Sequence, residues 1–278
     1  MTQPADNPSD TPGDAASRPV VFVHGLWLHA TSWDSWVDLF REAGYAPMAP
    51  GWPGDSDTVE ETRRDPSQVA DKGIDDVVDH YAQIIRGLDA PPIVIGHSFG
   101  GLIVQRLLGQ DLAAAAVAID PAPIQGVLVL PVSALRVASI ALRKPANRHE
   151  AISLTADQFR YGFGNALPAQ ESNDLYERWN IPSPGKPLFE AALANFTPHS
   201  PAKVNTGNRD RGPLLITAGG QDHTVPVAIS TATRRQYHKS PAVTDFRDFP
   251  DRGHSLTVDH GWREVAEYVL DWLKQRGV

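Results

Sequence analysis

Ser98 carries the clearest chemical signal in this sequence. It lies in Gly96-His97-Ser98-Phe99-Gly100, which is a G-x-S-x-G pattern. An apolar run over 92–96 precedes the pattern and helical periodicity over 100–110 follows it, which predicts a sharp strand-to-helix turn. Such a turn presents the serine hydroxyl at the carboxyl end of a sheet, where it can act as a nucleophile. A glycine-rich turn whose serine only caps the helix has the same pattern, so the rest of the chain must decide.

A serine hydroxyl is a weak nucleophile at neutral pH and needs a neighbouring base. Among the ten histidines, His254 in "FPDRGHSLTVD" follows the last strand-like run and precedes the last helical segment. It is therefore expected on a loop at the same sheet edge as Ser98. His260 lies close to the start of the final helix and is interpreted as a surface or capping residue. The side chain of His97 is expected to point away from the turn, so His254 is the predicted base.

The base in turn needs an acid that orients it, and two aspartates follow predicted strands. Asp222 lies in "LLITAGGQDHTVP" and Asp120 in "AIDPAP". Asp222 gives the chain order serine, acid, histidine that this topology favours. Asp120 is followed by Pro121, which restricts its backbone to an extended form. We therefore predict Asp222 as the acid and keep Asp120 as the alternative.

Acyl transfer also needs hydrogen-bond donors for the negative charge that develops on the carbonyl oxygen. The backbone N–H of Phe99, directly after the nucleophile, is one predicted donor. The other is expected from the loop after the first strand, where "VHGLW" places Leu26 after a glycine. Several aromatic side chains are candidates for the substrate pocket, although core packing explains each of them equally well: Trp27, Phe159, Tyr161 and Phe163.

A sheet must bring these scattered residues together, and the sequence predicts one. Fully apolar strand-like runs alternate with amphipathic helical segments, which is typical of a parallel sheet covered on both faces. The expected fold class is therefore α/β, with a mostly parallel sheet of about six strands joined by right-handed crossovers. The predicted strands cover 19–25, 45–50, 92–96, 115–120, 213–219 and 242–249, and the predicted helices cover 31–44, 73–88, 100–110, 226–238 and 262–275.

The alternation divides the chain into three parts. Residues 1–18 are polar and rich in proline, aspartate and serine, and are predicted to be a disordered tail rather than a signal peptide. Residues 19–120 and 213–278 form the predicted α/β core. Between them, 121–212 has no strand alternation and contains an apolar helical stretch over 127–144, so a helical cap over one sheet edge is expected. The turn "GWPGDSD" at 51–57 is interpreted as a tight connection.

Composition excludes several classes of function. The chain has 278 residues and no cysteine, which rules out disulfides, thiolate catalysis and cysteine zinc sites. Its net charge of −8 gives no overall electrostatic footprint for nucleic acid or an anionic membrane. No apolar window is long enough to span a membrane. No Walker motif, dinucleotide-binding glycine motif or H-E-x-x-H motif is present, so neither a cofactor nor a metal is expected. The default expectation is a cytoplasmic protein of undetermined oligomeric state.

On "HGLW", "GHSFGG", "GGQDHTVP" and "DRGHS", the sequence resembles the capped serine hydrolases of the α/β-hydrolase fold over residues 19–277. The resemblance implies Ser98 as nucleophile, His254 as base, Asp222 as acid, and the Leu26 and Phe99 amides as the oxyanion hole. It disfavours dehalogenases and epoxide hydrolases, which have aspartate at the position of Ser98. Two departures are visible: the chain has no room for the two leading strands of many members, and its cap has no motif that identifies a substrate.

The expected function is hydrolysis of an apolar carboxylic ester or a lactone through an acyl-enzyme, without a cofactor. The same fold and catalytic layout also host C–C bond hydrolases, perhydrolases and hydroxynitrile lyases, and fold alone does not separate them. A small-ligand sensor with an intact triad is an alternative of another class. The physiological substrate, the acyl-chain length, the stereopreference and the motion of the cap are not determined by the sequence.

Overall fold

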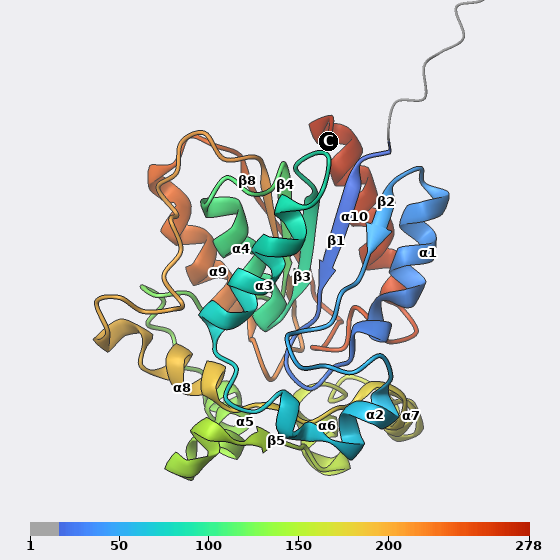
Figure 1. The fold of residues 1–278 in the computed structure, drawn as a ribbon, viewed down its shortest axis with the longest axis vertical. Coiled ribbons are helices and arrows are strands. Elements are labelled where there is room, and N and C mark those ends of the chain that lie inside the picture. Colours follow the sequence, from blue (N-terminus) through green and yellow to red (C-terminus); the bar gives the residue numbers. More distant parts are fainter. Residues whose placement is uncertain (1–16) are drawn as a thin grey trace, which may run out of the picture.

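Six parallel strands form the central sheet of the computed structural model, in the order β2-β1-β3-β4-β7-β8 (Figure 1). The structure describes residues 17–278, so most of the predicted 1–18 tail lies outside the described residues. Every neighbouring pair of strands is parallel, which confirms the predicted α/β fold with about six strands. The strands are β1 (Pro19–Val23), β2 (Ala46–Met48), β3 (Ile93–His97), β4 (Ala115–Ile119), β7 (Leu214–Gly219) and β8 (Thr244–Phe249).

Alternate residues of the central strands enter two separate apolar cores. Val21 and Val23 of β1 belong to the core on one face, and Val20 and Phe22 belong to the core on the other. This division follows from the two-residue period of a strand, and it explains why the runs read as continuously apolar. Both faces of the sheet are therefore covered by helices.

Two helices cover one face of the sheet and three cover the other (Figure 1). Aromatic and aliphatic side chains of α1 and α10, among them Trp36, Phe40 and Val265, fill the core on the first face. The core on the second face contains side chains of α3, α4 and α9, for example Ile85, Leu102 and Ile229 in that order. The bounds are α1 (Asp34–Glu42), α3 (Ile74–Arg86), α4 (Phe99–Gly109), α9 (Val227–Gln236) and α10 (Trp262–Arg276).

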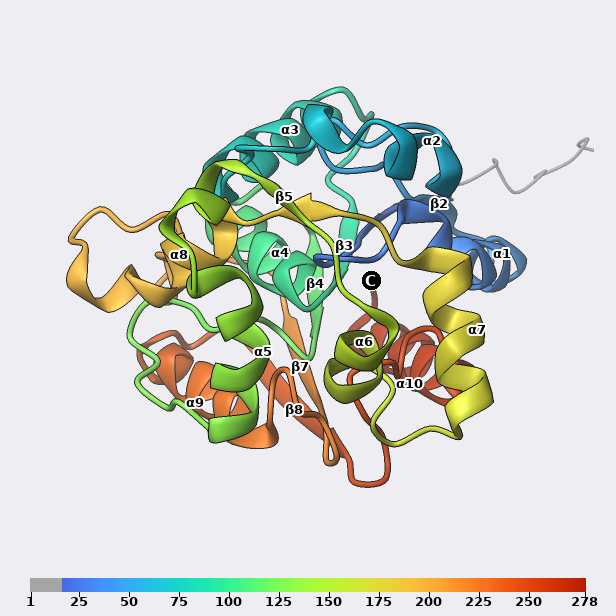
Figure 2. The same cartoon turned by 90° about the horizontal axis from the view of Figure 1, so that it is seen from below.

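The long interval between β4 and β7 adds no strand to the central sheet. Its helices gather beyond the carboxyl ends of the strands, and Figure 2 shows them in front of the sheet when the molecule is seen from below. The short helix α2 (Val59–Arg64) lies at the same end (Figure 1). The elements of the interval are α5 (Val132–Leu142), β5 (Ala151–Ile152), α6 (Ala156–Gly162), α7 (Ala169–Trp179), β6 (Ser183–Pro184) and α8 (Lys186–Ala192).

The structure differs from the sequence prediction in three local features. The helix expected over 127–144 begins only at Val132, because Pro131 occupies its N-cap and a proline disfavours helical backbone in the residue before it. The two-residue strands β5 and β6 pair with each other and were not expected from the sequence. Helix α2 was also missed. Among the described residues, the structure contains no helix with the length and apolar character of a membrane span.

Candidate active site

Ser98 lies in a strained turn between β3 and α4. Its backbone has φ 56° and ψ −120°, a positive φ that few residues other than glycine adopt. The turn is held on both sides: Ser98 N–H donates to the Ile119 carbonyl at 2.9 Å, and Ala122 N–H donates to the Ser98 carbonyl at 2.9 Å. These bonds fix the side chain at the carboxyl end of the sheet, as a nucleophile elbow requires.

The glycine after the elbow permits a close backbone approach. A Cβ atom on Gly100 would lie 2.1 Å from the carbonyl oxygen of Val23 in β1, a distance that no real side chain tolerates. The first turn of α4 therefore packs directly against the end of β1. The G-x-S-x-G pattern thus reflects a steric requirement of the turn.

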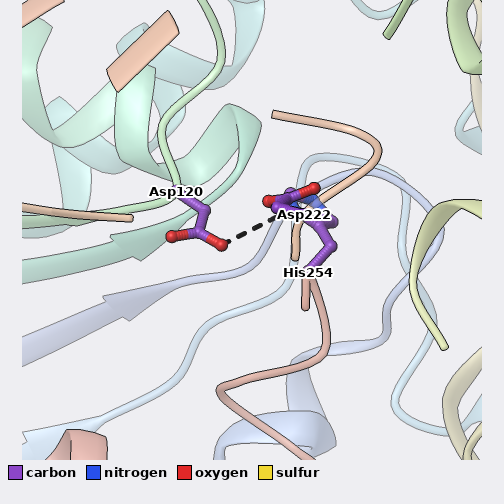
Figure 3. A group of neighbouring side chains, drawn as sticks. All are labelled: Asp120, Asp222 and His254. Carbon is purple, nitrogen blue, oxygen red and sulfur yellow. Dashed lines mark hydrogen bonds and ion pairs between the residues drawn. The ribbon is translucent and has the colours of Figure 1, made fainter. Parts of the chain in front are cut away.

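His254 and Asp222 meet at the same sheet edge (Figure 3). The distance from His254 Nδ1 to Asp222 Oδ2 is 2.6 Å, and both side chains are fully buried. The other carboxylate oxygen of Asp222 accepts hydrogen bonds from the N–H groups of Thr224 at 2.6 Å and Val225 at 2.8 Å. The aspartate is thereby fixed in position, and it can orient the imidazole and favour the tautomer with a proton on Nδ1.

Asp120 is a second buried carboxyl group beside this pair (Figure 3). Its Oδ1 accepts a hydrogen bond from the Gly219 N–H at 2.9 Å, while its Oδ2 lies 4.0 Å from His254 Nδ1 and has no hydrogen-bond partner. Asp120 and Asp222 converge because β4 and β7 are neighbouring strands. The distances favour Asp222 over Asp120 as the orienting acid.

The two carboxyl groups differ in their ionisation. Burial, and then the negative charge of Asp222, raise the pKa of Asp120 well above its ordinary value. Burial also acts to raise the pKa of Asp222, but the charge and hydrogen bond of His254, with the hydrogen bond from the Val225 N–H, lower it below its ordinary value. Asp120 is therefore the neutral member of the pair and Asp222 the ionised one.

His97 was expected to point away from the turn, but its ring packs against that of His254. The two ring centroids are 4.5 Å apart, and neither nitrogen of His97 has a hydrogen-bond partner among the described residues. Burial, followed by the neighbouring His254, lowers the pKa of His97 well below its ordinary value. His97 is thus a neutral ring that supports the predicted base. Its position directly before Ser98 was the only signal for this contact.

In the predicted triad, the Nε2 atom of His254 is the one that would take the proton of Ser98. It is buried and forms no hydrogen bond within the described chain. His260, the rejected alternative, has an exposed side chain that pairs with Glu171 at 2.9 Å. Of the two histidines, only His254 belongs to the buried cluster at the end of the sheet.

The two predicted oxyanion donors, Leu26 and Phe99, have free backbone N–H groups among the described residues. Phe99 is the first residue of α4, and no hydrogen bond between described residues uses its N–H or that of Leu26. Trp27 follows with φ 66°, and its N–H donates to Ser183 Oγ at 2.6 Å while its indole donates to the Ile152 carbonyl at 3.0 Å. The loop after β1 is therefore anchored to β5 and β6.

A buried contact between His24 and Asp55 supports the same loop from the other side. His24 Nε2 lies 2.9 Å from Asp55 Oδ2, and both side chains are almost fully buried. The indole N–H of Trp52 donates to the His24 carbonyl at 2.9 Å. Residues 51–57, interpreted from the sequence as a tight turn, thus hold the residue directly before Gly25. Asp55 and Trp52 were the only sequence features of that turn that could have indicated this supporting role.

Ser98 opens into an apolar cavity of about 220 Å³. Trp27 and Phe99 line it, as expected from the sequence for Trp27, together with side chains from α5, α8 and α9. Phe159, Tyr161 and Phe163 do not line it, contrary to the expectation. Phe159 and Phe163 are fully buried and stack on each other with centroids 4.9 Å apart, so they form core between α6 and the sheet. Phe163 also packs its ring against His254, at 4.8 Å.

Asp120, Asp222 and His254 are also the one group of described residues whose potential metal ligands lie together, within 4.8 Å of one another. The short bond between His254 Nδ1 and Asp222 Oδ2 occupies two of those ligand atoms. The arrangement therefore fits a hydrogen-bonded catalytic cluster better than a metal site.

Solved structures of hydrolases resemble the whole described fold. A methylesterase from Arabidopsis is 16% identical with a TM-score of 0.63, covering 92% of this chain and 99% of its own. A monoacylglycerol lipase from Paleococcus ferrophilus is 21% identical with a TM-score of 0.62, covering 93% and 94%. A pyrethroid hydrolase from Sphingobium faniae is 18% identical with a TM-score of 0.64, covering 93% and 98%.

These identities establish the fold alone, and no curated protein sequence matches this chain. The sequence profile of the alpha/beta hydrolase family, however, matches residues 20–268. That range includes all of β1 except Pro19, the turn at Ser98, both buried aspartates and the loop of His254. The chain therefore belongs to the alpha/beta hydrolase family.

Proposed function

We propose that this chain is a serine hydrolase that cleaves carboxylic esters through an acyl-enzyme, without a cofactor. The observation that carries the proposal is the pairing of His254 with Asp222 at 2.6 Å, at the sheet edge where Ser98 occupies a strained turn. A nucleophile, a base and an orienting acid on three separate loops of one edge have the arrangement of a serine triad.

In the proposed reaction, Ser98 Oγ attacks the ester carbonyl carbon while His254 Nε2 takes the hydroxyl proton. The carbonyl π electrons move to the oxygen, which accepts hydrogen bonds from the N–H groups of Leu26 and Phe99. When the tetrahedral intermediate collapses, the bond to the alkoxy group breaks and His254 returns its proton to the leaving alcohol. Water then attacks the acyl-enzyme with His254 again as base, which releases the acid and restores Ser98.

The cavity indicates an apolar acyl or alcohol group in the substrate. Its lining is almost entirely aliphatic and aromatic, for example Ile124, Val127, Leu188 and Ile229, which favours burial of hydrocarbon over charged groups. The solved structures of similar fold are named as esterases, a lipase and pyrethroid hydrolases. We propose an apolar ester as the substrate class, with lactones as a close variant that needs the same chemistry.

A substrate panel with a nucleophile variant tests the proposal. Nitrophenyl esters of graded acyl length and several lactones should be turned over, and Ser98→Ala should lose on the order of 10⁶-fold in kcat. A fluorophosphonate probe should modify the native chain once, on Ser98. Full labelling or unchanged turnover of Ser98→Ala would contradict the assignment of the nucleophile. Slow single turnover with retained product would instead favour a ligand sensor.

A further inference from the structure

The mouth of the catalytic cavity is surrounded by exposed apolar side chains. Eight large hydrophobic residues of the described chain are exposed, and seven of them come from two short segments, 128–135 and 193–196. Val132 and Phe196 are exposed by 83% and 84%, which is unusual for side chains of this size in a folded protein. Five of the seven also line the cavity that contains Ser98: Leu128, Val129, Leu130, Leu135 and Phe196.

Hydrogen bonds hold the two segments of this rim together. Asn195 Nδ2 donates to the Val127 carbonyl at 2.8 Å, and its Oδ1 accepts from the Gly126 N–H at 2.7 Å. Gln125 Nε2 donates to the Ala194 carbonyl at 2.8 Å. These bonds tie residues 125–127, directly before the first segment, to the second segment.

The same part of the chain is locally basic, although the whole chain has a net charge of −8. Residues 121–149 contain no aspartate or glutamate and four cationic residues: Arg136, Arg143, Lys144 and Arg148. All four are exposed, and none takes part in an ion pair between described residues. Asp157 lies in the same surface hollow as Arg136 and Arg143 without pairing with either. Although the whole chain is acidic, these four residues therefore form a positive patch beside the rim.

Helix α5 combines both properties on one face. Val132, Arg136, Ser139 and Arg143 recur at intervals of four, three and four residues, so they share a face, and all four are exposed. The opposite face carries Val137 and Ala141, which are buried. Figure 2 shows α5 on the side of the molecule that faces away from the sheet. Exposed apolar side chains together with nearby lysine and arginine are also what helices that lie on anionic lipid present to it, although there the two kinds usually occupy different faces.

We propose that the rim formed by 128–135 and 193–196, with the cations of α5 and the segment after it, docks on the surface of an anionic lipid bilayer. Apolar side chains would enter the lipid, and the arginine and lysine side chains would contact the anionic head groups. The proposal rests on the proposed function in one respect: docking would place the mouth of the cavity on the bilayer, so that an apolar ester could enter from the lipid towards Ser98.

Charge is what favours a bilayer over a second copy of this chain. A symmetric dimer through this face would bring the four cations of one copy close to those of the other, because such an interface joins the same patch to itself. An anionic lipid surface complements these charges and also accepts the apolar side chains. The occupant that satisfies both features is therefore an anionic bilayer.

Vesicle flotation tests the proposal. The full chain with Ser98→Ala, which prevents hydrolysis of lipid during the measurement, is mixed with phosphatidylcholine vesicles with or without phosphatidylglycerol. We expect binding to the vesicles that contain phosphatidylglycerol, weakened by salt. Adding Val132→Asp should lower this binding on the order of tenfold, since an apolar contact is lost and a repelled charge is gained.

Val243→Asp is the matched control. Val243 is also an exposed valine, but it precedes β8 at the opposite end of the sheet, so its substitution should leave binding unchanged. Arg143→Gln with Lys144→Gln should weaken binding only to the vesicles that contain phosphatidylglycerol. The corresponding pair on α10, Arg263→Gln with Lys274→Gln, should have no such effect.

Three results would overturn the proposal: no binding to either kind of vesicle, equal binding by the Val132→Asp variant, or a dimer in sedimentation that Val132→Asp dissociates without any vesicle binding. Val132 does not line the cavity, so Val132→Asp with Ser98 intact should hydrolyse a water-soluble nitrophenyl ester at the native rate. This assay separates the two proposals. Vesicle binding without ester hydrolysis would contradict the proposed function but would still support the docking surface.

Discussion

Asp222 Oδ2 lies 2.6 Å from His254 Nδ1, and both side chains are fully shielded from solvent. Asp120 Oδ2 lies 4.0 Å from the same nitrogen. One histidine thus has two buried carboxyl groups beside it, of which only one is close enough for a hydrogen bond. Burial acts to raise the pKa of Asp222, but His254 outweighs it and lowers this pKa below its ordinary value. Burial and the charge of Asp222 raise the pKa of Asp120. The pair therefore has one charge rather than two.

The first prediction concerns the roles of the two acids. Asp222→Asn should lower turnover by up to roughly 10⁴-fold, because the amide favours the wrong tautomer of the imidazole. Asp120→Asn should cost far less, because an amide resembles the neutral carboxyl group and can still accept the hydrogen bond from Gly219. Both variants are measured on one nitrophenyl ester. A near-inactive Asp120→Asn beside an active Asp222→Asn would reverse the assignment.

A second prediction follows from the raised pKa of Asp120. The folded chain keeps a proton on this carboxyl at pH values where the unfolded chain, with an ordinary value of 3.8, has released it. The stabilising contribution is therefore complete below that ordinary value and is lost as pH rises towards the folded pKa. Asparagine has no proton to lose, so the Tm of Asp120→Asn relative to the native chain should increase from about pH 5 to about pH 8.

Asp271→Asn provides the control for this measurement. Asp271 is an exposed carboxyl on α10, 4.0 Å from Lys274, so its substitution should change Tm by nearly the same small amount at both pH values. A relative Tm of Asp120→Asn that stays constant or decreases as pH rises would mean that Asp120 is ionised in the folded chain.

The third prediction concerns the loop that carries the Leu26 amide. A Cβ atom on Gly25 would lie 2.7 Å from Ser98 Cβ and 2.9 Å from the His97 carbonyl oxygen, so Gly25→Ala must displace either the loop or the nucleophile. We expect kcat to fall by about 10²- to 10³-fold, as when one oxyanion donor is lost. Gly207→Ala is the control, because nothing lies within 4 Å of a Cβ there. If Gly25→Ala keeps the native kcat, this loop does not supply an oxyanion donor.

The sequence was sufficient to predict the elements that position this site. Each apolar run became a strand, and the predicted boundaries differ from those of β3, β4 and β7 by only a residue or so, because two-sided burial imposes a continuous apolar pattern. Ser98, Asp222 and His254 could be chosen from their places after strands. The structure brings them to one sheet edge, and their catalytic roles remain predictions.

Contacts that depend on strand order could not be predicted in the same way. Asp120 reaches the side of Asp222 because β4 pairs with β7, and no local pattern indicates that pairing. The packing of His97 on His254 and the contact of His24 with Asp55 likewise join segments far apart in the chain. The exposed rim could not be predicted for another reason. Residues 127–131 have the composition of a buried helix, and only the position of Pro131 separates them from α5.

The last prediction separates residues that select the substrate from residues that hold the core. Ala138 on α5 is half-buried and lines the cavity, whereas Phe163 is fully buried and does not line it. Ala138→Phe should therefore fill part of the cavity, lowering kcat/KM for a long-chain nitrophenyl ester far more than for the acetate, with little change in Tm. Phe163→Ala should instead destabilise the fold, by about 3–5 kcal/mol for a buried aromatic. It should also lower kcat for every acyl length, since Phe163 packs on His254.

Thermal unfolding and a two-ester kinetic comparison on both variants decide between these effects. If the cavity binds the acyl chain, the ratio of kcat/KM values for long and short esters changes in Ala138→Phe and stays near native in Phe163→Ala. The opposite pattern would mean that the acyl chain lies against α6, close to Phe163. The cavity lined by α5 and α8 would then have to hold the alcohol portion of the ester, because Ser98 Oγ must lie between the two groups for attack on the carbonyl carbon.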